Sequence, residues 1–409
     1  MMMKRMLAML LALQMLTVAV WADGGQVLYD EGGGEALQDL LGEDAAAWPT
    51  VALPADGGDL QVAAKGAVLM DQGSGQVLYE KDAHTRLPIA SVTKVMTLLL
   101  VMEALDSGKI AWTDPVTCSE TAASMGGSQI WLEPGEIMSV EELVKAAAVV
   151  SANDACAALA EHISGSIPVF VAQMNQRAAQ LGMENTEFKD CSGLDDSGYS
   201  CAYDVAVMSR ALMEHKDIEK YTTIWMDSLR GGSSQLVNTN KLVRHYNGAT
   251  GLKTGTTNAA GHCLAATARR EDTAFVAVVL GCATTNDRWA GARTMLDYGF
   301  AGYTAYTPPA DAVTVAPIPV LGGQQKTVTA RPDTPQKLLL KKGAAEQVEM
   351  ETEVAADLQA PVSAGQTVGV WRLKLGEEIL AEYPIRTTAE VPAATLPWAY
   401  RLLMEALLA

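Results

Sequence analysis

Residues 66–97 read GAVLMDQGSGQVLYEKDAHTRLPIASVTKVMT. Two short apolar segments, Ala67–Met70 and Val77–Tyr79, flank Gln72–Gly75, and Gly and Ser between two such segments are typical of a hairpin turn. Further on, the apolar run Val95–Met102 predicts a buried helix. The stretch therefore predicts an antiparallel hairpin that leads into a helix of the protein core.

The start of that helix holds Ser91-Val92-Thr93-Lys94. Pro88 lies just before it, and proline is favoured where helices begin. Residues three apart share a helix face, so the Lys94 amine would reach the Ser91 hydroxyl, which needs a base to act as a nucleophile. The helix N-terminus would stabilise charge on the serine oxygen. Burial and a second cation, such as Lys253, would lower the pKa of Lys94. The alternative is an ordinary pair of surface residues.

A second motif, Ser151-Ala152-Asn153, falls between two helical segments, 144–150 and 154–163. A hydroxyl at this break could pass a proton between Lys94 and a departing amine. The Asn153 side chain both donates and accepts hydrogen bonds, so it can hold an amide of a substrate. Ser, Asn and Asp are also the preferred residues at helix N-termini, and helix capping is the alternative.

A third motif, Lys253-Thr254-Gly255-Thr256, is predicted to lie on a strand whose glycines let a substrate approach the backbone. Lys253 and the Thr254 hydroxyl are suited to binding a carboxylate. The backbone N–H groups of Ser91 and Thr256 could form an oxyanion hole, whose donors typically lower a barrier by several kcal/mol. Alone, Lys-Thr-Gly is most often a turn.

Together the motifs are far more specific, because Ser-x-x-Lys with Lys-Thr-Gly marks penicillin-binding proteins and class A β-lactamases. The segments Gly66–Thr97, Ser151–Ser166 and Gly251–Arg270 resemble the low-molecular-mass D-alanyl-D-alanine carboxypeptidases, serine penicillin-binding proteins that trim the stem peptide of peptidoglycan. The resemblance covers residues 60–305 strongly and 308–409 more loosely.

This resemblance implies a role for each motif residue. Ser91 would be the acylated nucleophile, Lys94 the base and Ser151 the proton relay. The residues implied in substrate binding are Asn153, Lys253, Thr254, Gly255, Thr256 and, at the start of a helix that resembles the family's last core helix, Arg288. The implied substrate is a stem peptide ending in D-Ala-D-Ala, with β-lactams as covalent inhibitors. One departure from the family is Ser192, in the loop 189–194, where many relatives carry His, Asn or Thr.

Three other functions share these motifs in whole or in part. A class A-like β-lactamase would need a Glu-bearing loop to activate the deacylating water, and no such spacing is found. A peptidoglycan endopeptidase or transpeptidase would differ only in the bond cleaved or the acceptor. A non-catalytic wall-binding protein would have no reason to keep the motifs. No Gly-x-Ser-x-Gly context supports a Ser-His-Asp triad.

The fold predicted is α/β of the α+β kind: an antiparallel sheet flanked by helices, with a helical insert, and a site between the insert and the sheet edge. The predicted segments are a signal peptide at 1–22, a flexible lead-in at 23–59, a catalytic domain at 60–305, a small β-rich domain at 308–392 and an amphipathic helix at 393–409. Predicted strands are Gly261–Arg269, Thr273–Leu280, Val313–Val315, Gln325–Ala330, Gln347–Thr352, Thr367–Leu373 and Glu378–Ile385.

Both ends of the chain predict a place outside the cytoplasm. Lys4 and Arg5 precede an apolar stretch, 6–20, that is short for a membrane span, with a cleavage site after Ala22. An uncleaved anchor is the alternative. The tail from Pro397 resembles the interfacial anchor helix of the family, although Arg401 is its only basic residue. A helix docked on the β-rich domain is the alternative there. We expect an exported protein on the outer membrane face or in the cell wall space.

Charge and cysteine content exclude other partners. The net charge is −18, from 30 basic and 48 acidic residues, so the chain should repel nucleic acid. The six cysteines form no Cys-x-x-Cys pair and the five histidines no ligand spacing, so no metal or cofactor is predicted. Hairpin geometry predicts that Cys263 and Cys282 stay apart. Cys191 and Cys201 could close a short loop, but buried free thiols are favoured for all six.

Overall fold

The computed structural model describes residues 26–27, 60–309 and 311–408. The chain divides into two compact units, Met1–Ala301 and Gly302–Ala409. The predicted signal peptide and nearly all of the predicted lead-in lie outside the described residues.

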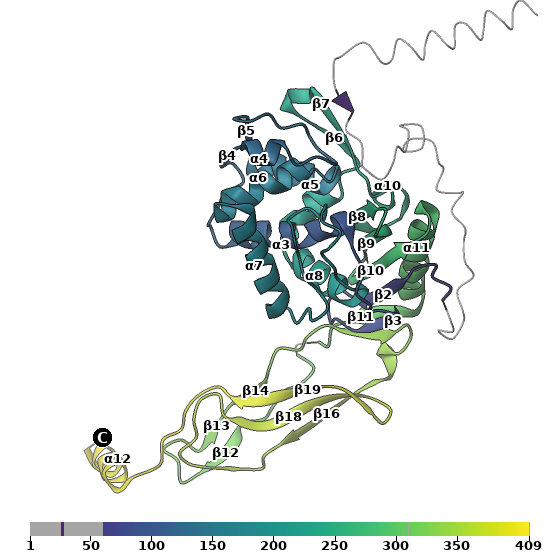
Figure 1. The fold of residues 1–409 in the computed structure, drawn as a ribbon. Helices are drawn as coiled ribbons and strands as arrows, with labels where there is room; N and C mark the ends of the chain where they lie inside the picture. Colours follow the sequence, from purple (N-terminus) through teal and green to yellow (C-terminus); the bar gives the residue numbers. More distant parts are fainter. Residues whose placement is uncertain (1–25, 28–59, 310, 409) are drawn as a thin grey trace, which may run out of the picture. The chain divides into compact units, whose positions relative to one another are not determined.

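The first unit is built on a five-stranded antiparallel sheet (Figure 1). Its strand order is β3 (Val77–Lys81), β2 (Gly66–Asp71), β10 (Thr273–Cys282), β9 (Gly261–Arg270) and β8 (Ala249–Thr257), so that β8 is an edge strand. The central strand β10 is continuously apolar over Phe275–Leu280, and all six of these residues are fully buried. A strand buried on both faces reads as an unbroken apolar run, which explains this composition.

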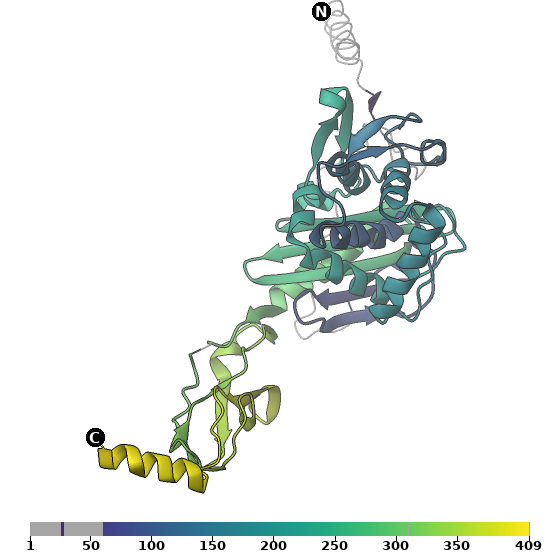
Figure 2. The same ribbon diagram turned by 90° about the vertical axis from the view of Figure 1, so that its left-hand side faces the viewer.

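Helices cover both faces of the sheet. On one face lie α3 (Lys94–Asp106) and α8 (Ala202–Glu214), and on the other lies α11 (Thr285–Gly302) (Figures 1 and 2). A Cβ on Gly299 would come 2.9 Å from the Phe275 ring, so α11 packs closely on β10. Since α3 has apolar residues on all sides and nearly all of them are buried, it forms the centre of the core. The predicted α+β architecture is confirmed.

The remaining elements of this unit form the helical insert and its connections. The longer ones are α5 (Val140–Val149), α6 (Asn153–Ser164) and α7 (Ile167–Gln180), and α5 begins with a capping box between Ser139 and Glu142. The short ones are β1 (Gln26–Val27), η2 (Ala90–Thr93), β4 (Pro115–Thr117), α4 (Glu120–Ala123), β5 (Ile137–Ser139), η3 (Lys216–Ile218), α9 (Glu219–Thr222), β6 (Met226–Leu229), η4 (Arg230–Gly232), β7 (Ser234–Val237) and α10 (Leu242–His245).

The β9–β10 hairpin corrects the predicted pairing register around Cys263 and Cys282. Arg270 pairs with Thr273, so Leu264 pairs with Val279, one position away from the predicted register, and a bulge then places Cys282 opposite His262. The two cysteines form no disulfide with each other, as predicted. Burial raises the pKa of Cys282 to about 12. All six cysteines are buried thiols.

The second unit is an all-β body followed by a helix. Its strands are β11 (Tyr303–Tyr306), β12 (Ile318–Leu321), β13 (Thr327–Val328), β14 (Ala330–Pro332), β15 (Leu338–Lys341), β16 (Val348–Val354), β17 (Leu358–Gln359), β18 (Thr367–Leu375) and β19 (Glu378–Thr387), with η5 (Ala345–Gln347) between β15 and β16. Its core centres on Trp371, which lies 5.1 Å from the Tyr383 ring.

The predicted strand Val313–Val315 was wrong. The chain forms its strand at Ile318–Leu321 instead, where Val328 and Leu358 supply neighbours on the two sides. Both runs have β-type composition, and only pairing between distant segments decides which one becomes a strand.

The last helix, α12 (Leu396–Leu408), leaves seven large apolar side chains exposed: Leu396, Tyr400, Leu402, Leu403, Met404, Leu407 and Leu408. Among the described residues, no single helix is long and apolar enough to cross a membrane. The pair α6 and α7 has the length and composition only when taken together across an 85° bend, and most of α6 is buried core.

Candidate active site

The nucleophile candidate lies on a short turn just before the central helix. Ser91 belongs to the 3₁₀ turn η2, and Lys94 is the first residue of α3. The Lys94 ammonium donates to Ser91 Oγ at 2.8 Å and to the carbonyl oxygen of Ser192, also at 2.8 Å. Lys94 is fully buried. The two side chains that the sequence placed on one helix face therefore meet, although in a tighter turn than an α-helix.

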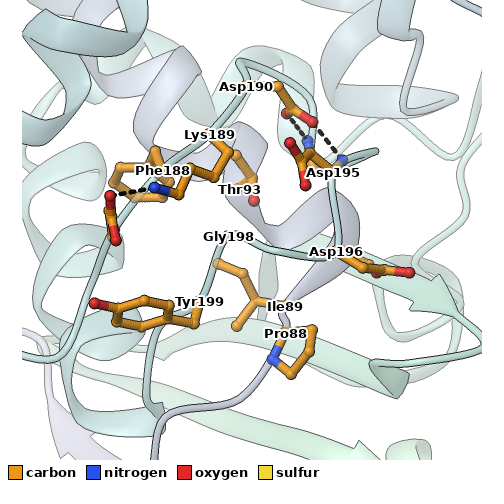
Figure 3. A pocket seen from close by; sticks show the side chains of 13 residues that line it. Pro88, Ile89, Thr93, Phe188, Lys189, Asp190, Asp195, Asp196, Gly198 and Tyr199 are labelled. Atoms are coloured by element: carbon orange, nitrogen blue, oxygen red, sulfur yellow. Dashed lines mark hydrogen bonds and ion pairs between the residues drawn. The ribbon is translucent and has the colours of Figure 1, made fainter.

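The loop that carries Ser192 is held by one carboxylate. Asp190 accepts from the backbone N–H groups of Ser192 (2.6 Å), Gly193 and Asp195 (2.6 Å), and the last two bonds are drawn in Figure 3. A Cβ on Gly193 would lie 1.9 Å from the carbonyl oxygen of Ala90, so only glycine lets the loop contact the nucleophile turn. The space left between loop and turn is about 10 Å³.

This packing limits the consequence of the departure at position 192. Ser192 contacts Lys94 through its carbonyl oxygen, a group that every residue has. The replacement of a bulkier polar side chain by serine therefore leaves the contact with Lys94 in place.

The second motif brings two polar atoms into the interior without partners. Ser151 Oγ and Asn153 Oδ1 are buried, and neither has a hydrogen-bond partner among the described residues. The Asn153 amide nitrogen donates to the carbonyl of Gly126 at 3.0 Å. No side chain caps α6, whose N-cap is Ala152, so the capping interpretation was wrong. Leaving a buried polar atom unsatisfied costs about 1–3 kcal/mol, which points to a ligand that completes these bonds.

The third motif lies on the edge strand β8 and not in a turn. Lys253 is buried, and its ammonium donates to the carbonyl of Thr254 at 3.1 Å. The buried Thr254 hydroxyl donates to Thr239 Oγ1 at 2.7 Å. A Cβ on Gly255 would lie 2.6 Å from the carbonyl oxygen of Ile89 and 3.0 Å from the Ser91 nitrogen. The strand therefore contacts the nucleophile turn backbone to backbone.

Arg288 reaches the same strand from α11. Its guanidinium donates to Thr256 Oγ1 at 3.1 Å and stacks 4.4 Å from the Trp289 ring centre. The side chain is buried, with 4% of its surface exposed. Ser91, Lys94, the third motif and Arg288 are thus joined by direct contacts at the edge of the sheet, while Ser151 and Asn153 lie at the start of α6.

The two lysines of the motifs lie near one buried thiol. Burial raises the pKa of Cys156 to about 11, while the charges of Lys94 and Lys253 act in the opposite direction. Asp154 and Asp190 also act on this thiol and raise its pKa. Three cations, Lys94, Lys253 and Arg288, are buried in this part of a protein of net charge −18. That concentration of cations is what an anionic substrate would need.

Several contacts of the site were not predicted from the sequence: the acceptor Thr239, the carbonyls of Gly126 and Ser192, and the buried carboxylate of Asp154. Asp154 accepts from the N–H groups of Ile130 and Leu132 and so fixes the loop beside Asn153. Burial raises the pKa of Asp154. No sequence motif signals these contacts, because most of them use backbone atoms.

A serine bonded to a buried lysine, beside the edge strand of a five-stranded antiparallel sheet, defines the serine penicillin-binding class of fold. Residues 51–284 match the family model described as D-alanyl-D-alanine carboxypeptidase, and residues 306–393 match the C-terminal domain of penicillin-binding protein 5. The chain belongs to the D-alanyl-D-alanine carboxypeptidase family, the low-molecular-mass penicillin-binding proteins.

Individual relatives agree over most of the chain. The D-alanyl-D-alanine carboxypeptidase DacF of Bacillus subtilis (strain 168) is 44% identical over 81% of this chain and 86% of its own length. DacC of Escherichia coli (strain K12) is 34% identical over 79% of this chain and 83% of its own length. The crystal structure of penicillin-binding protein 5 from Haemophilus influenzae superposes with a TM-score of 0.73 and 31% identity, covering 82% of this chain and 99% of that one.

Proposed function

We propose that the chain removes the terminal D-alanine from peptidoglycan stem pentapeptides and that Ser91 is the nucleophile. Family membership makes the chain a serine-type D-alanyl-D-alanine carboxypeptidase. The observation that carries the assignment to Ser91 is the 2.8 Å hydrogen bond from a fully buried lysine to its hydroxyl oxygen. A serine hydroxyl becomes nucleophilic when a neighbouring base takes its proton.

In the acylation step, Ser91 Oγ attacks the carbonyl carbon of the penultimate D-Ala as the neutral Lys94 amine takes the hydroxyl proton. The bond to the terminal D-Ala nitrogen then breaks, and that nitrogen receives a proton from Lys94 through the Ser151 hydroxyl. Ser151 Oγ is buried without a partner among the described residues, so it is open to this relay. The backbone N–H groups of Ser91 and Thr256 would hold the developing oxyanion.

The substrate is held from both sides of the reacting bond. Asn153 Oδ1 lacks a partner in the described part of the chain and would accept an N–H of the stem peptide. The terminal carboxylate would accept from Lys253, from Arg288 and from the Thr254 hydroxyl, which would turn its proton from Thr239 Oγ1 to the substrate and accept from the Thr239 hydroxyl instead. Arg288 donates to Thr256, which belongs to the same strand as Lys253, so these groups converge on one end of the peptide.

In the deacylation step, a water molecule attacks the Ser91 ester and gives its proton to Lys94, and the ester oxygen recovers a proton to restore the serine. The products are a tetrapeptide and free D-Ala. β-Lactams inhibit this family because they acylate the same serine, and the lactam nitrogen, tethered in the ring, is not released.

The test is D-Ala release from a stem pentapeptide by the full chain. Ser91→Ala should abolish release, and Ser107→Ala, at the exposed end of α3, is the matched control. Mass spectrometry after penicillin treatment should find the adduct on the peptide that contains Ser91. An adduct on another residue, or release by Ser91→Ala, would reject the assignment.

We further propose that the protein is exported and held on the outer membrane face by α12. The exposed apolar side chains of α12, Leu403 and Leu407 among them, support this. Since Arg401 and Glu405 are its only charged residues, binding should depend on apolar burial and not on lipid charge. Flotation with zwitterionic and with anionic vesicles should recover the protein equally, and Leu403→Glu should reduce both.

Failure to float with either vesicle would instead favour a helix that docks on the protein itself. Export is tested separately, by N-terminal sequencing of the secreted protein. The expected first residue is Asp23, and a retained Met1 would show an uncleaved anchor.

A further inference from the structure

An open groove of about 370 Å³ lies outside the residues assigned to catalysis. It is bordered by the loop that carries Trp131 and Glu133, by Glu136 just before β5, and by Arg230 and Ser233 in the β6–β7 hairpin. The hairpin and the β4–β5 segment lie at the same end of the first unit (Figures 1 and 2). We propose that this groove binds a sugar ring of the glycan strand that carries the stem peptide, an inference that rests on the proposed function.

Trp131 is presented to solvent in an unusual way. Its side chain is 59% exposed and its φ is 57°, a left-handed conformation that costs a bulky L-residue about 1–2 kcal/mol. Hydrogen bonds to both neighbours of Trp131 hold this conformation. Asp154 accepts from the N–H groups of Ile130 and Leu132. Arg230 donates to the carbonyl of Ile130 at 2.9 Å. A strained backbone that holds a large apolar ring in water is typical of a ligand site.

The charges of the groove disfavour an anionic ligand. Arg230 is the one cation among the lining residues, all of which are described, and its guanidinium is committed to the protein. It forms two bonds with Glu136, at 2.7 and 3.1 Å, and others with Ser234 Oγ and the Ile130 carbonyl. Glu133 adds a further carboxylate. An anionic segment would therefore be repelled.

A sugar ring fits what remains. Its C–H face carries partial positive charge and is attracted to the negative face of an indole ring. Its hydroxyls can donate to Glu133 and to the exposed Ser233 hydroxyl oxygen, whose own proton is donated to the Arg230 carbonyl at 3.0 Å. The groove volume is within the range of small-molecule sites, about 300–1,000 Å³.

The loop that borders the groove is hydrogen-bonded to the second motif, and its length matches the part of the stem peptide that leads to the sugar. The carbonyl of Ser128 accepts from the Asn153 N–H at 2.7 Å, and the Ile130 N–H donates to the Asp154 carboxylate. The loop that leads to Trp131 is therefore hydrogen-bonded to the start of α6. Three residues of extended chain separate the penultimate D-Ala from the sugar and span about 10 Å. The three residues from Ser128 to Trp131 cannot span more than about 11 Å.

The test compares kcat/KM for three substrates: an N-acylated tripeptide ending in D-Ala-D-Ala, the free stem pentapeptide and the disaccharide pentapeptide. With Trp131→Ala we expect a loss of about tenfold for the disaccharide pentapeptide alone, mainly in KM. Trp131→Phe, which keeps an aromatic face, should retain most of the efficiency. Ile137→Ala, which removes another exposed apolar side chain on β5, is the matched control and should change nothing.

Other results would overturn the proposal. An equal loss on the free pentapeptide would show that the groove binds peptide, and a loss on all three substrates would show distortion of the active site. No loss on any substrate would show that the groove binds nothing that matters to turnover. Binding of the peptide-free disaccharide, followed by saturation-transfer NMR, does not depend on catalysis. It should weaken in Trp131→Ala even if the unsubstituted chain released no D-Ala, a result that would reject the proposed function alone.

Discussion

Gly255 offers a direct test of how the edge strand positions the nucleophile. In Gly255→Ala the new Cβ would meet backbone atoms at 2.6 Å (Ile89 oxygen), 3.0 Å (Ser91 nitrogen) and 3.0 Å (Val92 nitrogen). Carbon atoms pack best about 3.5–4.0 Å from their neighbours, so strand and turn must separate by about 0.5–1 Å. None of these atoms belongs to a flexible side chain that could move aside.

The expected result follows from that displacement. A misplacement of about 1 Å in a catalytic site can lower the rate about 100-fold. Overpacking a core contact costs about 1–3 kcal/mol of folding stability, which a protein of this size can tolerate. We therefore expect Gly255→Ala to fold but to be acylated by a fluorescent penicillin about 100-fold more slowly, with a parallel loss in D-Ala release.

Two measurements make the test decisive. Urea unfolding should show a cooperative transition for Gly255→Ala, which separates slow chemistry from loss of the fold. Gly302→Ala is the matched control, because a Cβ there has no neighbour within 4 Å. Acylation of Gly255→Ala at the normal rate would show that β8 and the nucleophile turn are not in backbone contact.

Three further predictions use other contacts of the first unit. In Lys94→Arg the guanidinium stays protonated at neutral pH and cannot act as a base. The rate of acylation by penicillin should therefore fall at least about 1,000-fold, and an unchanged rate would exclude Lys94 as the base. Thr239→Val removes the acceptor of the Thr254 hydroxyl, a bond worth about 1 kcal/mol, so steady-state kinetics should show KM rising about fivefold, while Thr239→Ser should restore it. The hydrogen bonds from Arg230 lower the pKa of Glu136 below 4.5, so the pair contributes stability above that pH and loses it as the pH falls through the lowered pKa. Urea midpoints measured from about pH 3 to 6 should therefore vary less in Glu136→Gln than in the unsubstituted chain, and equal slopes would contradict the ion pair.

Local pattern was sufficient where neighbours along the chain make the contact. The pair Ser91 and Lys94 is three residues apart, and its hydrogen bond follows from the turn that the sequence predicts. The same holds for the unbroken apolar run of β10, whose burial on both faces was expected from composition alone. Errors arose where pairing between distant segments decides, as at Val313–Val315 and in the bulge before Cys282.

The order of a few residue types along the chain was enough to predict the chemistry: serines, two lysines, an asparagine and an arginine, with the helices and strands that carry them. The partners that complete the site come from distant segments and became known from the folded chain. The carbonyl that accepts from Lys94 is 98 residues away, and the hydroxyl that accepts from Thr254 is 15 residues away. Nearly every residue has both a carbonyl and an N–H group, so side-chain identity cannot reveal which of them the fold will bring to the site.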